Sequence, residues 1–145
     1  MTADMSREDG RAVVEFVFLG TLMLVPLIYL VLILGAVQAG AFAATTAARE
    51  GGRAFTTSPS EDDAAARGRA AAALSFEDFG VLDGSSVSFA CDGAPCLRPD
   101  GRVKVTARVS VALPLVPSFL ADVLPASIPI SVTHVASADR FGGAP

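Results

Sequence analysis

The sequence predicts an α+β membrane protein with a long N-terminal transmembrane and stalk helix, a second short helix and a small C-terminal antiparallel β-sheet. Three observations lead to this fold class. The run from Phe16 to Val37 carries no charged residue, an alanine-rich segment follows it, and apolar and polar residues alternate from Arg102 to Leu113. These patterns divide the chain into a short N-terminal tail (1–10), a transmembrane helix and stalk (11–52) and an α+β domain (53–145).

The composition agrees with a single membrane anchor and excludes one class of partner. The 145 residues are 52% hydrophobic with a mean hydropathy of +0.53, which is apolar for an ordinary soluble domain. The net charge is -4, the pI is about 4.8, and the basic residues are scattered along the chain. A nucleic acid is therefore not expected as a partner.

The apolar run is long enough to span a bilayer and leads into a stalk. At 1.5 Å per residue it measures about 33 Å, against a hydrocarbon thickness of about 30 Å. Alanine dominates Gln38–Glu50, so the helix should continue to about Glu50 and either end at Gly51 and Gly52 or fray shortly after them. Pro26 removes a backbone hydrogen bond inside the span and should kink or locally loosen the helix. Small residues recur every four positions, either as a helix-packing face or as a product of composition: Gly35, Ala39, Ala43 and Ala47.

A second helix is predicted from Pro59 to about Leu74. Ser58 stands as its N-cap, Pro59 at its first position and Glu61 where a capping box requires an acid. The apolar side of this helix is mostly alanine, which packs closely but buries little area per residue.

The C-terminal half predicts three or four antiparallel strands. The strongest signal is Arg102–Leu113, in which every second residue is apolar, and shorter strands are expected at Ser86–Ala90 and Ile128–Ala136. Asp100-Gly101 marks a turn before the long strand. Residues 114–129 hold four prolines and form a connection that has room for a short helix. The apolar face of the sheet should pack on the stalk or on the second helix.

No catalytic, cofactor or metal site is predicted. His134 is the only histidine, and although Ser131 and Asp139 are near it in sequence, a lone histidine in an alternating strand is usually a surface or edge residue. Cys91 and Cys96 enclose four residues that include turn formers. They form either a disulfide that pins a hairpin outside the cytoplasm or two separate thiols.

Glu15 is the anomaly of the apolar segment, since a carboxylate inside a bilayer costs on the order of 3 kcal/mol at mid-span. Either it reaches water at the headgroup boundary or something compensates its charge. The run from Gly10 to Phe16 resembles the processing site of type IV prepilins, in which a peptidase cuts after the glycine and the fifth mature residue is a glutamate. A cut between Gly10 and Arg11 would leave the new amine on the same helical face as Glu15, about 6 Å along the axis.

The chain as a whole resembles the TadE/TadG-like minor pseudopilins of tight-adherence (Flp, type IVb-like) pilus systems. The resemblance is carried by Glu15 and Phe16, the span with Pro26, the alanine-rich stalk through Ala54, and the tail from His134 to Phe141. It implies a bacterial, single-pass subunit or assembly factor of an adhesive pilus, with its N-terminus inside and its C-terminal domain outside the cytoplasmic membrane. The implied partners are other pilins, a prepilin peptidase, an inner-membrane platform, a secretion ATPase and the lipid bilayer.

A second interpretation is a secreted or membrane-anchored extracytoplasmic binding module unrelated to pili. The small residues from Ala39 to Ala43 resemble a signal-peptidase site. The mature N-terminus would be Arg11 for a pseudopilin, near Ala44 for a secreted module and Met1 for a simple anchor.

Overall fold

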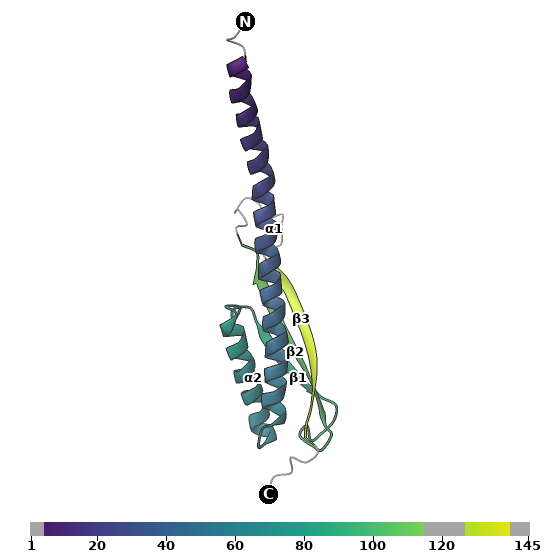
Figure 1. The fold of residues 1–145 in the computed structure, drawn as a ribbon. Coiled ribbons are helices and arrows are strands. Elements are labelled where there is room, and N and C mark those ends of the chain that lie inside the picture. The colour runs from purple at the N-terminus through teal and green to yellow at the C-terminus, as the bar shows by residue number, and fades with distance from the viewer. Residues whose placement is uncertain (1–4, 115–126, 140–145) are drawn as a thin grey trace. The chain divides into compact units, whose positions relative to one another are not determined.

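The computed structural model describes residues 5–114 and 127–139 (Figure 1). It contains two helices, α1 (Met5–Thr56) and α2 (Glu61–Asp78), and three strands, β1 (Ser86–Cys91), β2 (Arg102–Ala112) and β3 (Ser127–Ser137). The chain divides into two compact units, residues 1–35 and residues 36–145, and the second is called the α/β unit. The α+β class, the long N-terminal apolar helix, the second short helix and the antiparallel sheet are confirmed.

The first unit is the uncovered part of α1. Its apolar side chains have no protein around them: Phe16 is 77% exposed, Met23 75% and Val31 62%. The most apolar window of this helix has a mean hydropathy of 2.7 and none of it is buried. Among the described residues, α1 is the one helix long and apolar enough to cross a membrane. The helix continues through Pro26.

The expected end of α1 at Glu50 is wrong, because the helix runs on to Thr56. Gly51 and Gly52 are buried inside it. A Cβ at Gly51 would lie 3.1 Å from the carbonyl oxygen of Gly68, and one at Gly52 would lie 3.0 Å from the Cβ of Ala136. These glycines serve close packing in the α/β unit rather than helix termination.

The expected start and end of α2 are also wrong, by a few residues. Ser60, not Ser58, is the N-cap, and its Oγ accepts a hydrogen bond from the Asp63 N–H at 3.3 Å. The Oγ of Ser58 instead donates to the Ala54 carbonyl at 2.8 Å, so Ser58 belongs to the end of α1. The helix continues past Leu74 to Asp78, because Phe76 is buried in the core.

The sheet has three antiparallel strands in the order β1-β2-β3. The predicted strands are confirmed, with ends that differ by one residue at most, and the turn at Asp100-Gly101 is present, with Asp100 at a φ of 59°. The alternation predicted for β2 is confirmed too, since Val103, Val105 and Ala107 are fully buried. The short helix considered for the connection would fall in residues 115–126, outside the described residues.

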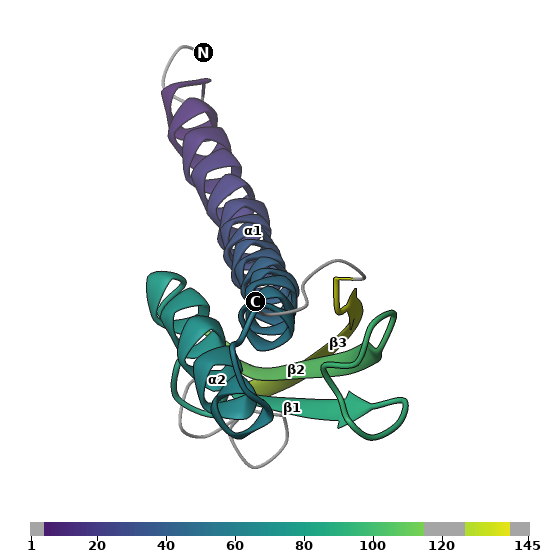
Figure 2. The ribbon, with the colours of Figure 1, turned by 90° about the horizontal axis from the view of Figure 1, so that it is seen from below.

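The α/β unit has two layers, with the C-terminal half of α1 and α2 on one face of the sheet (Figure 2). Both expected partners of the sheet are used: Gly52 of α1 approaches Val105 and Ala136, and Gly68 of α2 approaches Phe89. The buried core consists mainly of small and β-branched side chains: Ala43, Ala44, Ala47, Ala48, Phe55, Ala64, Ala72, Phe76, Val103, Val105, Ala107, Val109 and Val111.

Candidate functional site

The residues predicted for processing and subunit assembly all lie in the uncovered part of α1. Gly10, Arg11, Glu15 and Phe16 are exposed. Arg11 and Glu15 are four residues apart on one helix and therefore share a face. A carboxylate and a guanidinium thus stand next to a surface that is otherwise aliphatic and aromatic.

That surface is hollowed around Pro26. An open groove of about 470 Å³ is lined by Phe18, Thr21, Leu22, Val25 and Pro26. Proline lacks a backbone N–H, so the Leu22 carbonyl four residues earlier has no intrahelical donor there. The shape and the apolar lining suit a lipid chain or another helix rather than a polar ligand.

The small-residue strip does not form one outward face. Gly35 is exposed and nothing lies within 4 Å of a Cβ built there. Ala39 is half-buried, whereas Ala43 and Ala47 are both 0% exposed. The C-terminal half of the strip is therefore used in the chain's own core, which leaves Gly35 and the partly covered Ala39 for an outside partner.

The sequence analysis missed the close crossing of α1 and α2. A Cβ at Gly68 would lie 3.0 Å from the Gly51 carbonyl oxygen and 2.6 Å from Cζ of Phe89. The Phe89 ring stacks on Phe55, with centroids 5.0 Å apart. The signal was present in the four-residue spacing of small residues on both helices, Ala43, Ala47 and Gly51 on α1 and Ala64, Gly68 and Ala72 on α2.

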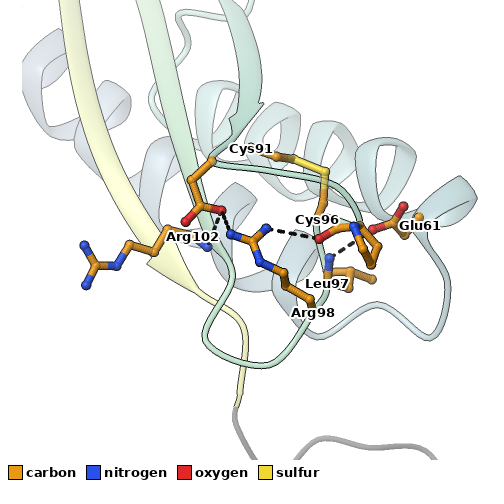
Figure 3. The surroundings of a disulfide bond; sticks show 8 residues. Glu61, Cys91, Cys96, Leu97, Arg98 and Arg102 are labelled. Carbon is orange, nitrogen blue, oxygen red and sulfur yellow. Dashed lines mark hydrogen bonds and ion pairs between the residues drawn. A yellow bond between two sulfur atoms is a disulfide. The ribbon is translucent and has the colours of Figure 1, made fainter.

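The two cysteines are joined in the turn between β1 and β2 (Figure 3). The Cα atoms of Cys91 and Cys96 are 5.4 Å apart and their sulfur atoms are bonded. The ring ties the end of β1 to the ten-residue connection, in which the Gly101 N–H donates to the Arg98 carbonyl at 2.8 Å.

Asp92 organises the same turn. It accepts a hydrogen bond from the Arg102 N–H at 3.1 Å and pairs with the Arg98 guanidinium at 2.8 Å. Figure 3 labels these two partners, Arg98 and Arg102. The backbone donor from Arg102, followed by the Arg98 side chain, holds the pKa of the Asp92 carboxyl below its ordinary value of 3.8, although partial desolvation acts in the opposite direction.

Glu61 has a role that the sequence did not reveal. It was predicted to complete a capping box, but its Oε1 accepts a hydrogen bond from the Leu97 N–H at 3.0 Å (Figure 3). The first turn of α2 is thereby attached to the disulfide-closed turn, 36 residues away in sequence.

His134 lies on the core-facing side of the edge strand β3, opposite Val105. Its ring approaches Gly52, where a built Cβ would lie 3.7 Å from its Cδ2. Ser131 is three positions earlier in the strand and so faces the other way. His134 and Ser131 do not meet, and the part of the chain described by the structure holds no group of three residues able to bind a metal ion.

Comparison with known proteins gives no relative for this chain: no family model, no curated protein and no solved structure matches it.

Proposed function

We propose that this chain is a pilin-like structural subunit or assembly factor of a tight-adherence pilus, held in the cytoplasmic membrane by one transmembrane helix. The proposal is based on one observation: the two parts of α1 have different surroundings. Its first part is an uncovered apolar surface, and the same uninterrupted helix ends as a buried element of a small antiparallel α/β unit.

The uncovered part has the properties of a membrane span. Between Val13 and Leu34 most large apolar side chains are more than half exposed, for example Leu22 at 57% and Leu30 at 61%. Complete removal of one such side chain from water lowers the free energy by roughly 1.5–3 kcal/mol. A surface of this kind is stable inside a bilayer or between helices, and it would drive aggregation in water.

Pairing of the Glu15 carboxylate with a cation of a neighbouring subunit would hold the subunits together side by side. It lies one turn after Arg11 and is flanked by Val13, Val14 and Phe16. A carboxylate in this position is stabilised by a cation supplied at the same depth, and the amine created by a cut after Gly10 is such a cation. Neighbouring subunits that pair Glu15 with this amine would be held in a fixed register.

The disulfide supports the proposed orientation. Disulfides persist in oxidising compartments and are rare in the cytoplasm, so Cys91 and Cys96 favour an α/β unit outside the membrane. With the N-terminus inside, the resemblance to tight-adherence pseudopilins implies a prepilin peptidase, an inner-membrane platform and a secretion ATPase as partners.

The packing of α1 disfavours the alternative of a cleaved, secreted binding module. A cut near Ala44 would remove Gly40, whose backbone lies against Val111 and Ile130. It would also remove Ala43, which is 0% exposed in the core. The α/β unit is thus built on the segment that such a cut would discard.

The test combines N-terminal sequencing with one matched pair of variants. The mature protein isolated from membranes should begin at Arg11. Glu15→Ala should insert in the membrane but lose association with other pilins, whereas Glu50→Ala, an exposed carboxylate in the α/β unit, should behave as the parent. A mature N-terminus near Ala44, or unchanged surface fibres and adherence after deletion of the gene, would contradict the proposal.

A further inference from the structure

The two halves of α2 bury side chains of very different size. Near the C-terminal end of the helix, Phe76 is 2% exposed. The first half instead buries Ala64 and Gly68, which have little or no side-chain surface to remove from water. Hydrophobic burial therefore stabilises the first half of α2 less than the second, and the first half depends more on its other contacts.

One such contact joins the first turn of α2 to the turn between β1 and β2. The Leu97 N–H donates a hydrogen bond to Oε1 of Glu61 at 3.0 Å (Figure 3). A hydrogen bond to a charged acceptor is stronger than one between neutral groups. Leu97 and the preceding Cys96 are also partly buried against the hydrophobic core. The position of Leu97 therefore affects how firmly the start of α2 is attached.

The disulfide fixes that position. Leu97 directly follows Cys96, whose sulfur is bonded to Cys91, the last residue of β1. Without this bond, closure of the turn would cost the loop more conformational entropy. The ion pair of Arg98 and Asp92 would remain, but its side chains are 34% and 40% exposed, and exposed pairs contribute little to stability.

We propose that the disulfide controls whether the first half of α2 is attached to the rest of the α/β unit. In the oxidised chain the turn holds Leu97 beside Glu61. Reduction by a dithiol breaks the S–S bond, each sulfur takes up one electron and one proton, and the dithiol becomes a disulfide. The turn then loosens and the hydrogen bond from Leu97 is lost. The helix opens from its N-terminal end, while Phe76 keeps its other end in the core.

Opening of the first half would uncover the aromatic pair beside Gly68. A Cβ built on Gly68 would lie 2.6 Å from Cζ of Phe89, so this part of the α2 backbone lies directly against the ring. The Phe89 ring stacks on Phe55, which is 5% exposed. The reduced chain would therefore present an apolar surface that the oxidised chain covers.

The sheet should stay closed when α2 opens. Strands β1 and β2 are paired along the whole length of β1, from Ser86 opposite Arg108 to Cys91 opposite Val103. The side chains of Val103 and Val105 are 0% exposed. Neither the strand pairing nor this burial passes through the sulfur atoms, so reduction removes neither of them.

The proposal also gives an order of maturation, and this step rests on the proposed function, in which the α/β unit lies outside the membrane. A chain made in the reducing cytoplasm carries thiols at both cysteines, and they are oxidised after export. A thiol oxidant of the disulfide-exchange class would accept the two electrons and two protons. The first half of α2 would then close over Phe55 and Phe89 only outside. The redox control itself is a property of the α/β unit and can fail while the proposed function stands.

The test is hydrogen exchange of the full chain in detergent micelles, with and without a dithiol reductant. Reduction should speed exchange of the amides of residues 64–69 about tenfold or more, and it should change those of residues 103–109 by less than about twofold. The double variant Cys91→Ser and Cys96→Ser should match the reduced parent.

A matched pair of variants tests the hydrogen bond in the oxidised chain. Glu61→Ala should also speed exchange of residues 64–69 about tenfold, because it removes the acceptor of the Leu97 N–H. Asp62→Ala removes another exposed acid from the same helical turn and should exchange like the parent. In the chain that carries Cys91→Ser and Cys96→Ser, Glu61→Ala should have no further effect, since the bond is already lost.

Three results would overturn the proposal. Exchange in residues 64–69 that reduction leaves unchanged would show that the disulfide does not hold α2. An equal rise in residues 103–109 would show that it stabilises the whole α/β unit instead. Additive effects of Glu61→Ala and the double serine variant would show that the hydrogen bond and the disulfide act separately.

Discussion

At the scale of single residues, the contact between α1 and α2 depends on glycines that leave room for another group. Gly51 and Gly68 face each other, and the Phe89 ring occupies the space beside Gly68. A larger side chain at Gly68 does not fit without moving Phe89, which also stacks on Phe55.

Gly68→Ala should therefore destabilise the α/β unit. The added methyl group would lie 2.6 Å from Cζ of Phe89, and overpacking of this kind typically costs about 1–3 kcal/mol. The measurement is the thermal midpoint of the full chain in micelles. Gly35→Ala is the control, because nothing lies within 4 Å of its Cβ, and it should leave the midpoint unchanged or raise it slightly. Equal midpoints for Gly68→Ala and the parent would contradict the packing described here.

Asp92 gives the turn a defined pH dependence. Because the Arg102 N–H and the Arg98 side chain lower its pKa below 3.8, the folded chain binds the proton more weakly than the unfolded chain does. The stabilisation is present above this ordinary value and is lost as the pH falls through the lowered pKa.

Asp92→Asn should consequently reduce stability at pH 7 and flatten its decline between pH 5 and pH 2. Hydrogen exchange of the β2 amides across this range reports the change. Glu50→Gln, at an exposed site on α1, should keep the parent's profile. A parent and an Asp92→Asn variant with parallel profiles would show that this carboxylate contributes nothing to the pH dependence.

At the scale of the elements, the sequence predicted strands better than helix ends. The alternation of β2 is a local pattern that fixes both faces, so Val103 to Val111 were assigned correctly without knowing their partners. The sequence offers more than one possible capping residue between α1 and α2, and only the tertiary structure shows which of them caps a helix. Ser58 and Ser60 both had the right chemistry, and Glu61 was drawn to Leu97 rather than to the cap.

Ser60→Ala should test which serine caps α2. Loss of its bond to the Asp63 N–H is expected to cost about 1 kcal/mol of stability, the usual value for an N-cap. Ser58→Ala should cost less, since its Oγ only supplements the last carbonyls of α1. Chemical denaturation of both variants in micelles decides the order. A larger loss for Ser58→Ala would restore the capping box inferred from the sequence.

At the scale of the whole molecule, the two parts of α1 carry different kinds of side chain. Its first part exposes large apolar side chains, and its second part buries small ones. A helix that must contact lipid needs area, whereas a helix that must lie against another backbone needs small residues.

Carbonate extraction tests the anchor directly. The full chain should remain in the membrane pellet at alkaline pH and leave it only with detergent, because the uncovered segment is long and apolar enough to span. Leu24→Arg, in the middle of that segment, should shift a measurable fraction to the soluble or degraded pool, since a central arginine opposes insertion by roughly 3 kcal/mol. Recovery of the parent in the carbonate supernatant would remove the membrane assignment.

The sequence alone determined the features that depend on local composition and periodicity. These features are the apolar span, the second helix, the alternating strands and the cysteine spacing, and each can be recognised from residues that are close together in the sequence. The sequence also predicted the processing site at Gly10 and the role of Glu15, which stay predictions.

Only the tertiary structure decided how the small residues are used. The four-residue spacing from Gly35 to Ala47 predicted a single strip on one face of the helix, yet Ala43 and Ala47, in its second half, are buried in the chain's own core. Likewise, only the strand register showed which residues lie beside the exposed cations of β2: Ala90 and Val135 beside Lys104, and Ser86 and Ser131 beside Arg108. The physical reason is that burial and charge neutralisation are long-range properties, set by segments that meet only after folding.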